Sequence, residues 1–72
     1  MITITQLARA AGVPLDFIYD NYRAMNEGRH YECRLDGTDR FTAHAVDLMR
    51  GLYATNDKAA YLTDMRNRGL MG

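Results

Sequence analysis

The chain has 72 residues, of which 47% are hydrophobic, and nine acidic residues balance nine basic ones, so its formal net charge is zero. A chain of this length forms a single domain that buries only about 60% of the surface exposed in the unfolded state, which leaves little room for a deep catalytic pocket. The charge balance argues against strong non-specific binding to nucleic acid, which usually requires a basic protein.

A short helix is predicted for the first residues. Thr3 and Gln6 have the spacing of a capping box, and the apolar residues that follow Thr3 recur at helical spacing. Gly12 can end this helix in the left-handed conformation. The first helix is therefore expected over about residues 4–11.

A second helix is predicted directly after the first. Pro14 suits the first turn of a helix, where its missing N–H is not needed. An apolar stripe at helical spacing follows and ends before Gly28, so this helix is expected over about residues 14–26. Its members are Phe17, Ile18, Tyr22 and Met25. Two helices joined by a tight turn form a helix-turn-helix unit.

The pattern then changes to the alternation of a strand. From residue 30 to 35, Tyr31, Cys33 and Leu35 fall on one side, whereas His30, Glu32 and Arg34 fall on the other. Asp36-Gly37 is a strong hairpin-turn signal. A two-stranded ribbon is therefore predicted over about residues 30–41, with Cys33 as a small buried apolar residue.

Two further helices complete the prediction. Thr42 is a suitable N-cap for a helix over about residues 42–54, and Asn56 or Asp57 can cap another over about residues 58–67, which Gly69 ends. The apolar tail Leu70-Met71 can join Leu62 and Met65 in a self-association patch. Alternatively, the last helix simply packs on the first and third.

The order of these elements is that of a mostly α winged helix-turn-helix with a small β-hairpin. The run from Ile2 to Pro14 resembles the first helix and turn of MerR-type regulators, which read Thr-Ile-x-x-Leu-Ala and then Gly-Val. Arg23 falls where that family has a downstream Arg in its recognition helix. Arg40-Phe41-Thr42 is similar to the family's end-of-wing Arg-Tyr-Ser. The resemblance covers about residues 2–53.

In length, the chain is more similar to phage excisionases and related recombination directionality factors, which use the winged fold alone. The resemblance implies a small DNA-binding protein, either a transcriptional regulator or an excisionase. Its partners would be double-stranded DNA, further copies of the chain in a homodimer or a cooperative array, and a recombinase or host protein.

Candidate DNA-binding residues follow from the predicted second helix and ribbon. Asn can read adenine and Arg can read guanine in the major groove, while a basic ribbon can contact the backbone or the minor groove. Eight of the nine basic residues are Arg, whose planar fork suits phosphate and guanine. The candidates are Arg9, Asp16, Tyr19, Asn21, Arg23, Arg29, His30, Arg34, Thr38 and Arg40.

The sequence also departs from the family pattern. Tyr19-Asp20-Asn21 stands where MerR-type recognition helices usually have Arg-Tyr-Tyr, and Asp16 adds a second negative charge. Acidic residues on this helix favour an alternative function, in which the winged domain docks on another protein as an inhibitor or adaptor. Tyr22 and Tyr31 are expected to be partly buried, and Tyr19 is the best candidate for a phosphate or partner contact.

Neither catalysis nor a cofactor is expected. The chain contains no Ser, and its carboxylates are scattered. His30 and Cys33, the closest pair of soft metal ligands, would lie on opposite faces of a strand, so no metal site is predicted. Residues Met1 to Gln6 lack the basic start of a signal peptide, and no long apolar run follows, so a cytoplasmic location is expected.

Overall fold

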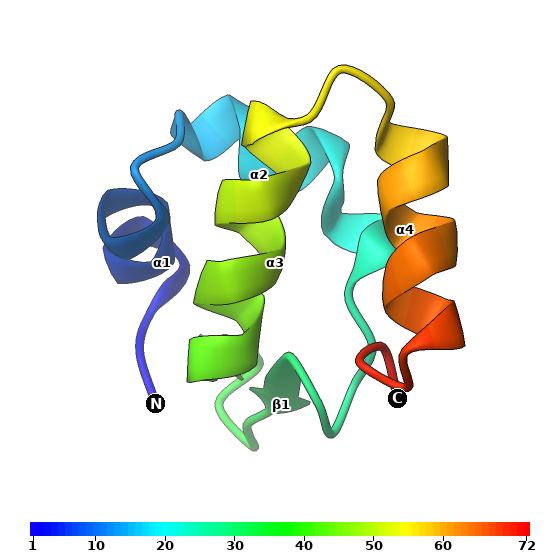
Figure 1. Cartoon of the computed structure of the whole chain (residues 1–72). Helices are drawn as coiled ribbons and strands as arrows, with labels where there is room; N and C mark the ends of the chain where they lie inside the picture. Colours follow the sequence, from blue (N-terminus) through cyan, green and yellow to red (C-terminus); the bar gives the residue numbers. More distant parts are fainter.

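The computed structural model describes all 72 residues and contains four α-helices, one 3₁₀ helix and a two-stranded antiparallel hairpin. The prediction of a mostly helical chain with a small hairpin is confirmed. Figure 1 shows α3 between α1 and α4, with the hairpin at one end of these helices. The elements are α1 (Ile4–Ala11), α2 (Leu15–Asp20), η1 (Tyr22–Ala24), β1 (Tyr31–Cys33), β2 (Asp39–Phe41), α3 (Ala43–Ala54) and α4 (Lys58–Asn67).

Helix α1 has the predicted bounds and the predicted caps. The Thr3 hydroxyl accepts a hydrogen bond from the backbone N–H of Gln6 at 3.2 Å, and the Gln6 side chain accepts one from the backbone N–H of Thr3 at 2.9 Å. Gly12 has a φ of 70° and ends the helix in the left-handed region. Every signal that defines α1 lies within a few residues of it.

Helix α2 is shorter than predicted. The prediction of one continuous helix over residues 14–26 is wrong. The α-helix ends at Asp20, and a 3₁₀ turn follows it from Tyr22 to Ala24. At the break, the side-chain amide of Asn21 donates a hydrogen bond to the Phe17 carbonyl at 2.8 Å. Asn side chains that bond to nearby backbone in this way compete with helix continuation. The tighter turn still buries Met25.

The hairpin has the predicted turn, but in its first strand only Tyr31 packs against the core. Asp36 accepts hydrogen bonds from the N–H and hydroxyl of Thr38, and Gly37 has a φ of 83°. Cys33 was predicted to be buried, with Leu35 on the same side of the strand, and both are exposed. His30 was predicted on the outer side and is only 1% exposed. The reason is length: β1 has three residues, so its far end extends past the helices into solvent.

The base of the hairpin is tied to the start of the chain. Ile2 forms an isolated bridge with Phe41, in which each backbone N–H donates to the other residue's carbonyl, at 3.0 and 2.8 Å. Phe41 thus pairs with Tyr31 on one side and Ile2 on the other. This anchors β2 in the core beside Leu7, Ile18 and Leu48.

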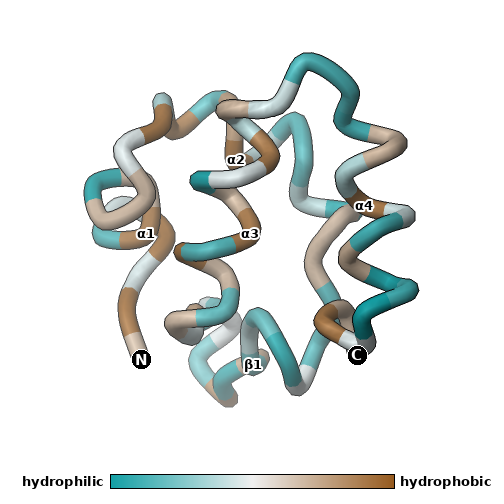
Figure 2. Tube along the Cα trace, viewed as in Figure 1, coloured by the Kyte–Doolittle hydropathy of each residue, from teal (hydrophilic) through white to brown (hydrophobic).

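Helix α4 covers one side of the core without contributing a buried residue. Figure 2 shows mainly hydrophilic residues along α4, whereas apolar ones recur along α3. Leu62 and Met65 are half-buried against the core. Asp57 caps α4 by accepting from the Ala60 N–H at 3.0 Å, as predicted. Gly51 lets α4 approach α3, because a Cβ atom at this position would overlap the ring of Tyr61.

The apolar tail completes the core. Met71 is 6% exposed, and its carbonyl accepts a hydrogen bond from the side-chain amide of Asn26. Leu70 is half-buried. Met71 therefore packs within its own chain, and Leu62, Met65 and Leu70 are the half-buried members of the suggested self-association patch. Separately, none of the helices combines the length and apolarity that crossing a bilayer requires.

Candidate nucleic-acid interface

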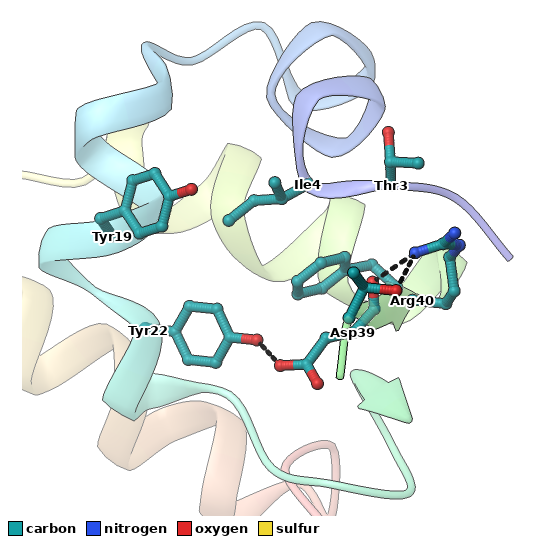
Figure 3. A pocket seen from close by; sticks show the side chains of 8 residues that line it. Thr3, Ile4, Tyr19, Tyr22, Asp39 and Arg40 are labelled. Atoms are coloured by element: carbon teal, nitrogen blue, oxygen red, sulfur yellow. Dashed lines mark hydrogen bonds between the residues drawn. The ribbon is translucent and has the colours of Figure 1, made fainter. Parts of the chain in front are cut away.

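An open cavity of about 430 Å³ lies between the start of α1, α2 and β2 (Figure 3). Tyr19 comes from α2, and Thr38 and Arg40 come from the hairpin, so the fold brings three of the predicted residues to one surface. The complete lining is Thr3, Ile4, Tyr19, Tyr22, Thr38, Asp39, Arg40 and Phe41.

Arg40 is held in place on the hairpin side of this cavity. Its Nη1 donates hydrogen bonds to the Thr38 hydroxyl at 2.9 Å and to the Asp39 carbonyl at 3.2 Å. These bonds use one guanidinium nitrogen, so the other two keep their donors for a ligand. A fixed guanidinium loses less side-chain entropy on binding than a mobile one.

Tyr22 links the two walls of the cavity. Its hydroxyl donates a hydrogen bond to the Asp39 carboxylate (Figure 3), and burial together with this carboxylate raises the pKa of Tyr22 above its ordinary value. The ring lies 5.5 Å from that of Tyr31 and 6.0 Å from that of Phe41, measured between centroids. Tyr22 and Tyr31 are half-buried as predicted. The contact fixes β2 relative to η1 and so sets the spacing between Arg40 and α2.

The sequence reasoning did not identify Asp39 as part of this site. One signal was available: a tyrosine on the apolar stripe of a helix needs a partner for its hydroxyl. Which residue supplies that partner depends on the hairpin register, in which Asp39 pairs with Cys33.

The outer side of α2 and η1 is charged. Asp16, Asp20 and Arg23 are exposed, and Tyr19 is 58% exposed between them and the cavity. Arg23 makes no ion pair. Asn21 was predicted to face DNA, but it is half-buried with its amide nitrogen bonded to Phe17. Its side chain therefore serves the end of α2.

The hairpin tip carries Arg34 and Leu35 into solvent. The Arg34 guanidinium lies 3.9 Å from the Asp36 carboxylate, and both side chains are more than half exposed. An exposed pair at this distance contributes little, so Arg34 stays available to another anion.

The remaining predicted residues lie elsewhere. Arg9 is exposed on α1, and Arg29 lines a different cavity beside α3 and α4. His30 is inside the core, where its Nδ1 accepts a hydrogen bond from the Asn26 N–H at 2.8 Å. A buried imidazole cannot make the predicted contact with a duplex, so His30 is a structural residue.

Cys33 is exposed at the end of β1, contrary to the prediction of a buried thiol. Hydrogen bonding to the Asp39 carboxylate and desolvation raise the pKa of the Cys33 thiol to about 11. The thiol is therefore protonated at neutral pH, and a protonated thiol is a weak nucleophile.

The comparisons with known proteins give no relative from which a role can be transferred. No protein-family model, no curated protein and no solved structure matches the chain.

Proposed function

We propose that this protein is a winged helix-turn-helix that binds duplex DNA with the face between α2 and the hairpin. The observation that carries the proposal is the joint lining of one open cavity by Tyr19 from α2 and by Thr38 and Arg40 from the hairpin. A helix beside a hairpin with polar and basic side chains between them is suited to a helix in the major groove with a wing on the adjacent backbone.

The charges on this face support the proposal. The guanidinium groups of Arg23 and Arg40 make no internal ion pair, and Arg34 makes only a long, exposed one. Arginines that are not neutralised within the chain are free to displace counterions from phosphates. Arg40 and Arg34 would contact the backbone, while Tyr19 and Arg23 would face the groove.

The test is a salt titration of binding to a mixed-sequence duplex pool, followed by selection of the preferred sequence. If Arg23, Arg34 and Arg40 each neutralise one phosphate, the log-log slope is about −2.7. Arg40→Gln should reduce the magnitude of this slope by about one. Arg68→Gln is the matched control, because Arg68 follows α4, away from the proposed face, and its guanidinium lies 3.5 Å from the Asp64 carboxylate. A flat salt dependence contradicts the proposal.

A second function, docking on another protein, is favoured by the exposed surface of α2. Asp16 and Asp20 are both exposed there, beside the partly exposed apolar side chains of Leu15 and Tyr19. Apolar residues flanked by carboxylates fit a protein surface with basic groups around an apolar centre.

The substitution Asp20→Asn separates the two functions. Removing a carboxylate from a surface that faces phosphates should strengthen duplex binding, because like charges repel. The same change should weaken docking on a basic protein surface. Asp64→Asn, on α4, is the matched control for the change in net charge. Loss of duplex affinity in Asp20→Asn would argue against the assigned DNA-binding face.

A further inference from the structure

We propose that a second open cavity, at the base of the hairpin, binds a phosphate-sized oxyanion through Arg29 and His44. This cavity has a volume of about 300 Å³ and is lined by Arg29, His44, Asp47, Met65 and Leu70. It shares no lining residue with the cavity between α2 and β2. The proposal therefore does not depend on DNA binding by that other surface.

Arg29 has a donor that the chain itself does not satisfy. Its Nε is the one buried side-chain nitrogen or oxygen atom without a hydrogen-bond partner. Leaving such a donor unpaired is costly, and more so when the group is charged. A guanidinium presents paired N–H groups that match the oxygens of a phosphate or carboxylate. Arg29 lines the cavity and its side chain makes no hydrogen bond or ion pair within the chain, so its guanidinium is not committed to another partner.

The backbone around Arg29 is fixed. The Arg29 carbonyl accepts a hydrogen bond from the Thr42 hydroxyl at 2.6 Å, and the Thr42 N–H donates to the His30 carbonyl at 2.9 Å. Arg29 is therefore attached to the residue that precedes α3. A side chain that starts from a fixed backbone needs less ordering when a ligand binds.

His44 supplies a second donor from the first turn of α3, and it is exposed. Because the Thr42 hydroxyl donates to Arg29, it does not cap α3. The positive end of the helix therefore adds to the charge of Arg29 on the same side. Burial lowers the pKa of His30, and electrostatic repulsion from Arg29 and His44 lowers this pKa further.

Asp47 is the one acidic residue in the lining, and its side chain is 72% exposed, so solvent screens its charge. The Asp47 carboxylate lies 3.7 Å from the Arg50 guanidinium. The other two lining residues, Met65 and Leu70, are apolar and half-buried. Apolar walls exclude water, which strengthens a charge-assisted hydrogen bond. The cavity is thus suited to a small anion with several oxygens.

The test is a titration of the full chain with inorganic phosphate at constant ionic strength, followed by NMR of the Arg29 Nε–H and the His44 ring. We expect both signals to shift and saturate together. Arg29→Gln keeps the aliphatic part of the side chain and removes the charge, and it should lower the phosphate affinity about tenfold. Arg68→Gln, a matched exposed arginine after α4, should leave it unchanged.

His44→Gln keeps the test decisive if Arg29→Gln affects folding. His44 is exposed, so this substitution should preserve the fold while it weakens phosphate binding a few-fold. Shifts that do not saturate, or equal affinities in wild type and both cavity variants, would overturn the proposal.

The same variants distinguish free phosphate from a phosphate of the DNA backbone. If a backbone phosphate occupies the cavity, Arg29→Gln and His44→Gln weaken duplex binding as much as they weaken binding of inorganic phosphate. If a free anion occupies it, duplex affinity is unchanged in both variants. A chain that binds phosphate and no duplex would refute the proposed function and leave the oxyanion site intact.

Discussion

The base and the tip of the hairpin lie in opposite environments. At the base, Tyr31 pairs with Phe41 inside an aromatic cluster, and His30 is buried beside them. At the tip, Arg34 and Leu35 are exposed, and the turn is held by local hydrogen bonds among residues 34–40. The comparison shows that the base anchors the hairpin in the fold, whereas the tip is free to meet a ligand.

Phe41→Ala should have the largest effect, because it removes a fully buried aromatic ring from the base. We expect a loss of about 3–5 kcal/mol in the free energy of unfolding, which is most of the stability of a small domain. Chemical denaturation followed by circular dichroism measures this. A loss below about 1 kcal/mol would show that the hairpin is not anchored through Phe41.

His30→Leu should cost about 1–3 kcal/mol at neutral pH, because the Asn26 N–H loses its acceptor. His30→Asn, which keeps an acceptor, should lose less. Denaturation of both variants at pH 7.5 provides the comparison. Equal stabilities would mean that the hydrogen bond to Asn26 is unimportant.

His30 also predicts how stability depends on pH. Burial lowers its pKa in the folded chain, so the folded state favours the neutral imidazole. Stability is then complete above the unfolded-state pKa of about 6.5 and falls as the pH drops through that value toward the folded-state pKa. Denaturation between pH 7.5 and 5 should show this fall in wild type and a smaller one in His30→Asn. An unchanged slope in the variant would assign the dependence to another group.

Tyr22→Phe should have an intermediate effect, because it removes the hydrogen bond from the Tyr22 hydroxyl to the Asp39 carboxylate. We expect a loss of about 1–2 kcal/mol in unfolding free energy. Tyr19→Phe is the control: Tyr19 is 58% exposed and makes no hydrogen bond within the chain, so its substitution should be neutral. If the two variants are equally stable, Tyr22 does not fix the hairpin.

Leu35→Ser should have the smallest effect on stability, within about 0.5 kcal/mol, because Leu35 lies at the exposed tip. Thermal unfolding of the variant and of wild type measures this difference in stability. A clear loss of stability would place Leu35 in a contact and remove the distinction between base and tip.

Where a structural signal is local, the sequence was enough to find it. The capping box of Thr3 and Gln6, the turn at Asp36-Gly37 and the cap at Asp57 each join residues no more than three apart, and all three are present. The end of α2 was missed because an α-helix and a 3₁₀ turn bury similar sides of a short segment. The hydrogen bond from the Asn21 side chain to the Phe17 carbonyl favours the end of the α-helix at this point.

The sequence predicted candidate residues for the interface, but it did not predict which of them lie on the same surface. Tyr19, Thr38 and Arg40 line one cavity, but Arg29 belongs to another and His30 to the core. Strand alternation gives two faces without saying which is buried, and a three-residue strand is too short for its own pattern to decide.

The sequence by itself determined the order of the elements, the caps of α1 and α4 and the hairpin turn, because short-range hydrogen bonds and backbone preferences define them. Only the tertiary structure decided which face of β1 is buried, how the hairpin sits against η1 through Tyr22 and Asp39, and where the tail packs. The bond from Asn26 to Met71 joins residues 45 positions apart. Contacts at such separations depend on how the helices pack, and local patterns carry no record of that packing.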